Sequence, residues 1–132
     1  MSLKKIPDYN LKQKILYVDH STAETLQNYG DLFYAEGNYS DALDFYQKAK
    51  FTEGLQKIKN IALETGDTML FQRVAKALSW EPASADWENL ARTALNLKKY
   101  LFARHALEKT RNEELLNSLK QIMQAEEHEK IS

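Results

Sequence analysis

The stretch that decides the fold is GDLFYAEGNYSDALDFYQKAK, residues 30–50. It holds five aromatic residues, three alanines and two glycines, spaced as on helix faces rather than in the alternation of a half-buried strand. Two antiparallel helices joined by a tight turn approach closely only where small residues face each other. We therefore expect a helix hairpin in which Gly30 faces Ala42. Four rings are expected to fill the space around this contact: Tyr29, Phe33, Tyr39 and Tyr46.

The composition of the whole chain extends this prediction to an all-α fold. Only four glycines and two prolines occur in 132 residues, which leaves little room for the frequent turns of an all-β fold. These helix breakers stand between segments with helical apolar spacing. The segments predict helices over residues 8–17, 22–35, 40–50, 53–65, 68–79, 85–97, 100–110 and 113–128.

Local signals mark several of the expected helix starts. Ser21 and Glu24 have the spacing of a capping box, in which each side chain bonds the backbone of the other residue. Ser84 and Asn112 stand where later helices begin, and both residue types are good N-caps. We expect all three serine and asparagine side chains to satisfy free backbone N–H groups.

The charge balance and the absence of cysteine exclude several classes of protein. Eighteen basic and nineteen acidic residues give a net charge of -1, so the chain has no overall field that attracts nucleic acid or an anionic membrane. Without cysteine there are no disulfides, thiolate nucleophiles or cysteine-bound zinc. No stretch approaches the ~20 apolar residues of a membrane span, and the first residues lack the pattern of a secretion signal. We expect a soluble, cytoplasmic protein.

A spaced set of large and small residues occurs more than once. In the first copy the set is Leu26, Tyr29, Gly30 and Phe33, then Ala42 and Tyr46. In a later copy it is Trp87, Leu90, Ala91 and Ala94, then Ala103 and Leu107. The turns at Gly37, Gly66 and Lys98 are equivalent in this alignment, with steps of 29 and 32 residues. We expect Trp87 to be buried as the opening residue of its copy and Trp80, before Pro82, to be less enclosed.

These residues resemble the tetratricopeptide-repeat family over about residues 22–110, and also the looser helical-hairpin repeats of coat and transport-complex subunits. The resemblance implies a right-handed α-solenoid of about three antiparallel helix hairpins plus a C-terminal capping helix. It implies a single domain, residues 1–132, with repeats at about 22–50, 53–79 and 85–110 and the cap at about 113–128. The closing proline of the family pattern is missing in every copy, which leaves the angles between repeats open. The alternative is an unrelated helical bundle.

The resemblance also implies a non-catalytic module that binds a protein or peptide partner in a groove. The groove positions would be Gln27, Asp31 and Tyr34 in the first copy, Gln56, Asn60 and Leu63 in the middle copy, and Glu88, Arg92 and Leu95 in the third. Some members grip a terminal carboxylate with cationic residues, but Gln27 and Asp31 stand in those places here, which disfavours that ligand. The middle copy does offer Lys57 beside Asn60. The alternative is that all these positions belong to ordinary solvated helix faces.

Signals for catalysis, cofactors or metal are lacking. His20, His105 and His128 lie far apart and none has the spacing of a metal site. The glycines form no phosphate loop, and no serine stands in a nucleophile elbow. We predict no catalytic residue, no cofactor and no metal. The alternative function is a small helical enzyme or regulator whose site the sequence does not reveal.

Two basic clusters keep a nucleic-acid-associated helical protein as a further alternative. The first is Lys4, Lys5, Lys12 and Lys14, interleaved with Tyr9 and Tyr17, and the second is Lys98, Lys99 and Arg104. Lysine and arginine side chains bind phosphates. A net charge near zero makes nucleic acid the weaker prediction, and an acidic protein partner or a solvated face is favoured.

The expected last helix carries an apolar stripe of Leu115, Leu116, Leu119, Ile122 and Met123. A repeat array exposes the apolar face of its final hairpin unless a further helix covers it. We therefore predict that this helix caps the third hairpin. The alternative is a docking helix for a partner or a second copy of the chain, which would make a homodimer.

Overall fold

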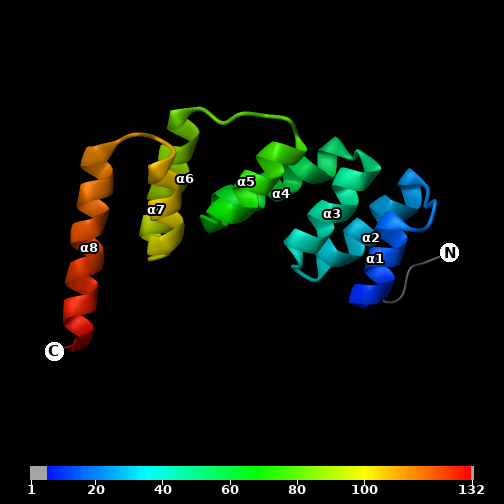
Figure 1. Ribbon diagram of the computed structural model, residues 1–132, viewed down its shortest axis with the longest axis horizontal. Coiled ribbons are helices and arrows are strands. Elements are labelled where there is room, and N and C mark those ends of the chain that lie inside the picture. The colour runs from blue at the N-terminus through cyan, green and yellow to red at the C-terminus, as the bar shows by residue number, and fades with distance from the viewer. Residues whose placement is uncertain (1–5, 132) are drawn as a thin grey trace. The chain divides into compact units, whose positions relative to one another are not determined.

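The structure is a computed structural model that describes residues 6–131, and this part of the chain forms eight α-helices and no strand (Figure 1). The helices are α1 (Tyr9–Tyr17), α2 (Ala23–Ala35), α3 (Tyr39–Ala49), α4 (Thr52–Thr65), α5 (Thr68–Ala77), α6 (Ser84–Asn96), α7 (Tyr100–Glu108) and α8 (Glu113–Ile131). The all-α prediction is confirmed. The first and last residues of each observed helix lie within three residues of the predicted boundaries.

The helices pack largely as sequential pairs, with α2 against α3 and α6 against α7. The chain divides into two compact units, one reaching to Lys59 and the other starting at Asn60. The division falls inside α4 rather than in a linker. The prediction of a single domain and that of a right-handed solenoid both stay predictions.

The core of the first unit is aromatic. Phe45 and Tyr46 on α3 are fully buried, and Phe33 on α2 is nearly so. The Phe33 and Phe45 rings stack with their centroids 5.5 Å apart, and Tyr29 lies 5.6 Å from Phe45. Of the four rings expected around the hairpin contact, Tyr29 and Phe33 on α2 meet Phe45 on α3, which was not among them. The expected Tyr39 instead meets Tyr34.

Tyr46 lies between two helical glycines. A Cβ atom added to Gly30 on α2 would stand 2.5 Å from the Tyr46 ring, and one added to Gly54 on α4 would stand 2.7 Å from it. Such distances are far below van der Waals contact, so both positions need glycine. The atoms closest to an added Cβ at Gly30 belong to Tyr46, one of the rings expected around this contact. The pairing of Gly30 with Ala42, which is fully buried, stays a prediction.

Helix α1 is attached to α3 by a buried lysine. Lys12 Nζ lies 2.5 Å from Asp41 Oδ1 and 2.9 Å from Asp44 Oδ2, and Lys12 is only 8% exposed. Burial lowers the pKa of this ammonium, but the hydrogen bonds to the two carboxylates outweigh burial, so the pKa of Lys12 is raised. Ile15 and Leu16 are buried beside it. One face of α1 therefore combines apolar packing with a compensated charge.

The core of the second unit is formed by α5, α6 and α7. The Phe71 ring meets the Trp87 and Trp80 rings edge to face, at 5.1 and 5.7 Å. Trp87 is buried and Trp80 is half-buried, so the predicted order of burial is confirmed. The fully buried Thr68 hydroxyl donates to the Phe102 carbonyl at 2.7 Å, which links α5 to α7.

The turns within the hairpins repeat in conformation as well as in spacing. Gly37, Gly66 and Lys98 have positive φ angles of 78°, 68° and 59°. After each of them a backbone N–H donates to a carbonyl five residues earlier: Asn38 to Phe33, Asp67 to Ala62 and Lys99 to Ala94. This bond ends a helix at a left-handed residue. The alignment of these three turns is thus confirmed at the level of the backbone.

A second series of left-handed residues follows α3, α5 and α7. Lys50, Ser79 and Arg111 have φ angles of 56°, 52° and 59°. Their spacing is again 29 and 32 residues. Because both series have the same steps, the segment from each hairpin turn to the end of that hairpin has a constant length. The length difference between copies therefore lies in the segment that runs from the end of one hairpin through the first helix of the next.

Of the three predicted helix N-caps, one is confirmed and two are wrong. The capping box at Ser21 and Glu24 is wrong, because α2 is capped by Thr22, whose Oγ1 accepts from the Thr25 N–H at 3.1 Å. Helix α6 starts at Ser84 itself, so Ser84 is not its N-cap. Asn112 does cap α8, since its Oδ1 accepts from the Leu115 N–H at 3.1 Å.

Candidate partner-binding surface

The predicted positions in the first unit lie on α2 and on the start of α4. Gln27 and Tyr34 are half-buried, and Asp31 and Gln56 are exposed. Tyr34 contacts side chains of both neighbouring helices. Lys57 Nζ from α4 lies 5.4 Å from the centroid of the Tyr34 ring, and the Tyr39 ring meets Tyr34 edge to face at 5.3 Å.

This arrangement joins the first helices of two successive hairpins. A cation over an aromatic face is favourable, and packing against Tyr39 limits the rotation of the Tyr34 ring. Tyr34 and Lys57 were both expected at this surface from the sequence, but Tyr39 was not. The signal for Tyr39 was its place at the start of α3, directly after the hairpin turn.

Asp31 is tied to the core below this surface. The Tyr46 phenol donates to Asp31 Oδ1 at 2.6 Å. Burial of the ring, together with this hydrogen bond, raises the pKa of the Tyr46 phenol. Asp31 therefore has a structural role, and one of its oxygens is already an acceptor for this chain.

The predicted positions in the second unit lie on α4 and α6. Asn60 and Arg92 are exposed, and Leu63, Glu88 and Leu95 are half-buried. Glu88 Oε1 accepts a long hydrogen bond of 3.4 Å from Asn112 Nδ2, just before α8. Since the nine predicted positions are divided between the two units, their forming one continuous groove stays a prediction.

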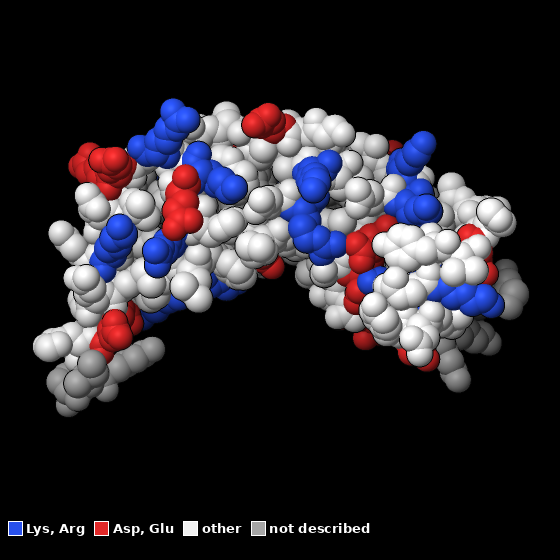
Figure 2. Space-filling model, viewed as in Figure 1, with Lys and Arg blue, Asp and Glu red and all other residues white. Residues whose placement is uncertain are grey.

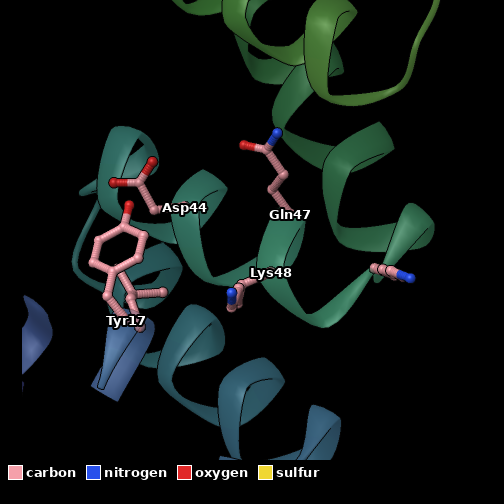
Figure 3. Close-up of a pocket in the computed structure, with 6 residues that line it drawn as sticks. Tyr17, Asp44, Gln47 and Lys48 are labelled. Atoms are coloured by element: carbon pink, nitrogen blue, oxygen red, sulfur yellow. The ribbon is translucent and has the colours of Figure 1, made fainter. Parts of the chain in front are cut away.

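A hollow of about 410 Å³ in the first unit was not predicted. It lies between the end of α1 and α3, and Figure 3 shows the Tyr17 side chain extending toward Asp44, with Gln47 and Lys48 further along α3. The full lining is Leu16, Tyr17, Asp44, Gln47, Lys48 and Lys50. The Asp44 carboxylate already accepts from Lys12. The hollow offers hydrogen-bonding groups but no arrangement of nucleophile and base.

Three residues of the two basic clusters bond other groups of the chain, whereas Lys14 and Lys98 are exposed. Lys12 is buried between two carboxylates. Lys99 Nζ donates to the Thr65 carbonyl at 2.6 Å, and Arg104 forms an ion pair with Glu108 at 3.2 Å. Lys4 and Lys5 lie outside the described residues. On the face seen in Figure 2, basic and acidic side chains are interspersed. The nucleic-acid alternative stays a prediction.

Among the described residues, no group of three or more histidine, aspartate or glutamate side chains is arranged to hold a metal ion. No helix in the same part of the chain combines the length and apolar character needed to cross a membrane.

Comparison of the chain with protein-family models, curated proteins and solved structures gave no significant match in any of the three. The resemblance to tetratricopeptide repeats therefore rests on the residues and turns described above. It stays a prediction.

Proposed function

We propose that this chain is a non-catalytic protein-interaction module of helix hairpins. It binds a peptide segment or a partner helix on a surface that includes Gln27, Tyr34, Gln56 and Lys57. The observation that carries this proposal is the Tyr34 ring, held between Lys57 of α4 and Tyr39 of α3. Aromatic side chains with a fixed orientation and a polar tip are favoured at protein interfaces.

The groups around Tyr34 suit a polypeptide ligand. The amide side chains of Gln27 and Gln56 both donate and accept hydrogen bonds, as the backbone of an extended segment requires. Lys57 supplies a positive charge and Asp31 a negative one, so a partner would be recognised by shape and by a mixed set of charges.

A peptide-library selection against the immobilised chain tests the proposal. Selected peptides should lose at least about tenfold in affinity for Tyr34→Ala, because truncating a central aromatic anchor removes most of its contact area. Lys57→Ala should weaken binding by a smaller factor. Lys48→Ala is the matched control, since Lys48 is an exposed lysine that lines a different hollow, and it should bind like the unaltered chain.

Circular dichroism of each variant separates a lost surface from a lost fold. Peptides that bind Tyr34→Ala as well as the unaltered chain would show that the surface is elsewhere. A chain that selects no peptide, but whose thermal midpoint rises with a small molecule or a metal, would instead favour the enzyme or regulator alternative.

A further inference from the structure

A second surface of the molecule, formed by α7 and α8, has apolar side chains that the fold does not cover. Leu101 is 74% exposed, the most exposed large apolar side chain among the described residues, and Phe102 and Met123 near it are half-buried. We call this surface the terminal patch, defined as Lys98, Tyr100, Leu101, Phe102, Met123 and Glu127.

The terminal patch contains two neighbouring hollows, of about 500 and 390 Å³. Tyr100 and Met123 line both of them. Lys98 and Leu101 line only the larger hollow, and Glu127 lines only the smaller one. Tyr100 and Met123 are therefore at the middle of the patch, with a cation toward one end and an anion toward the other.

Capping of α7 by α8 does not account for this surface. Leu119 is 1% exposed and supplies the buried contact of α8. Met123, one helical turn after Leu119, is half-buried, and Ile122 is exposed. Packing against α7 therefore leaves part of the apolar stripe of α8 uncovered. A single exposed leucine is ordinary on a protein surface, but Leu101 stands beside an apolar hollow and two further apolar side chains.

The neighbouring charged groups are already engaged. The Tyr100 phenol donates to Glu126 Oε1 at 2.9 Å, and Lys99 donates to the Thr65 carbonyl. Lys98 and Glu127 are the exposed charges at the two ends. A surface with opposite charges on either side of an apolar centre is complementary to itself after a two-fold rotation.

We propose that the terminal patch binds a second copy of this chain, with the two-fold axis near Tyr100 and Met123. Lys98 faces Glu127 of the second copy, and Leu101, which lies at the Lys98 end, packs against the smaller hollow of that copy. The self-complementary charges favour this occupant over an unrelated protein, which would need its own matching pattern. The proposal is independent of the Tyr34 surface, because the two surfaces share no residue.

Sedimentation velocity over a concentration series from about 1 µM to about 1 mM tests it. The unaltered chain should pass from 15.3 kDa to twice that mass as concentration rises. Leu101→Glu should stay monomeric throughout the series, because it places a charge in the apolar centre. Tyr9→Glu is the matched control: Tyr9 is 73% exposed on α1, and this variant should still dimerise.

Charge exchange tests the two-fold geometry. Lys98→Glu and Glu127→Lys should each weaken the dimer by about tenfold, since each pair occurs twice in it. The double variant should recover the original dissociation constant. A chain that is monomeric at every concentration, including one that binds another protein through this patch, overturns the proposal. So does a dimer that survives Leu101→Glu, or one in which the double variant is no tighter than the single variants.

Discussion

The ring of Tyr46 packs against backbone on two sides. Gly30 and Gly54 come from different helices, and each brings a Cα where other residues would bring a side chain. We call the space between these two glycines the Tyr46 slot. The glycines limit tilting of the ring, and the hydrogen bond from its phenol to Asp31 limits sliding of the ring along the slot. The residue thereby joins α2, α3 and the start of α4 within the first unit.

Gly30→Ala should lower the free energy of unfolding by about 1–3 kcal/mol, because its methyl group would overlap the Tyr46 ring. Chemical denaturation measures this change. At an exposed helical site the same substitution would stabilise the chain by about 1 kcal/mol. A stabilised Gly30→Ala variant would therefore contradict the close contact between Gly30 and the Tyr46 ring.

The Tyr46 phenol predicts how stability changes at high pH. Below its ordinary pKa of about 10, the phenol is protonated in the folded and unfolded chains alike, and it adds no pH dependence. Above that pH the unfolded chain loses the proton first, because the folded pKa is raised, so stability falls as pH rises. Lys12 acts in the same direction, since its folded pKa is also raised.

Denaturation curves between pH 8 and pH 11 check this, with Tyr46→Phe as the comparison. The variant should lose less stability over this range than the unaltered chain. Equal losses would show that Tyr46 does not supply the predicted slope.

The three hairpin turns allow a graded test of left-handed residues. Gly66→Ala should cost more stability than Gly37→Ala, because a Cβ at Gly66 would also lie 2.9 Å from the Ala94 backbone, whereas nothing lies within 4 Å at Gly37. Lys98→Gly should stabilise the chain by up to about 1 kcal/mol, since glycine adopts positive φ without strain. Thermal unfolding of the three variants gives the order, and a destabilised Lys98→Gly would contradict it.

At the scale of the elements, α8 packs against α7 in one part of its length. Leu119→Ala should cost about 2–5 kcal/mol, the range for a buried leucine, and Ile122→Ala should cost under about 1 kcal/mol because that side chain is 42% exposed. Denaturation of the two variants measures the difference. Similar costs for both would show that Leu119 is not the packing contact of α8.

The helix positions could be predicted from the helix breakers and the apolar spacing, because these signals act within a few residues. The contacts between helices could not be predicted in this way. The sequence paired Gly30 with Ala42, but it did not indicate that the Tyr46 ring would lie closest to a Cβ atom added at Gly30. Lys12 was interpreted as part of an exposed basic cluster, although its neighbours Ile15 and Leu16 are apolar and would have indicated a buried face.

The candidate surface was predictable only in its local parts. Tyr34 and Lys57 were both named from repeat spacing, and they do meet. Asp31 accepts a hydrogen bond from the buried Tyr46 phenol. This contact depends on how deeply Tyr46 lies in the core, and no local sequence pattern indicates that depth. The terminal patch depends on how far α8 covers α7, and this too is set by packing at a distance.

At the scale of the whole molecule, the chain has no cysteine, and its described residues contain no group of three or more histidine, aspartate or glutamate side chains placed to hold a metal ion, so we predict indifference to metal ions. Addition of Zn²⁺, Ca²⁺ or Mg²⁺ should leave the thermal unfolding midpoint unchanged, because stabilisation by a ligand requires a site that exists in the folded chain. Thermal scans with and without a chelator check this. A midpoint that rises with one of these ions would contradict the prediction that the chain has no metal site.

The Tyr46 slot also limits how this sequence changes over generations. A smaller residue in place of Tyr46 would leave a void between α2 and α4, and any larger residue at Gly30 or Gly54 would overlap the ring. Each single step away from the present arrangement is therefore unfavourable, although a coordinated change at all three positions need not be. We therefore expect descendants of this chain to keep Gly30, Tyr46 and Gly54 together or to exchange them together.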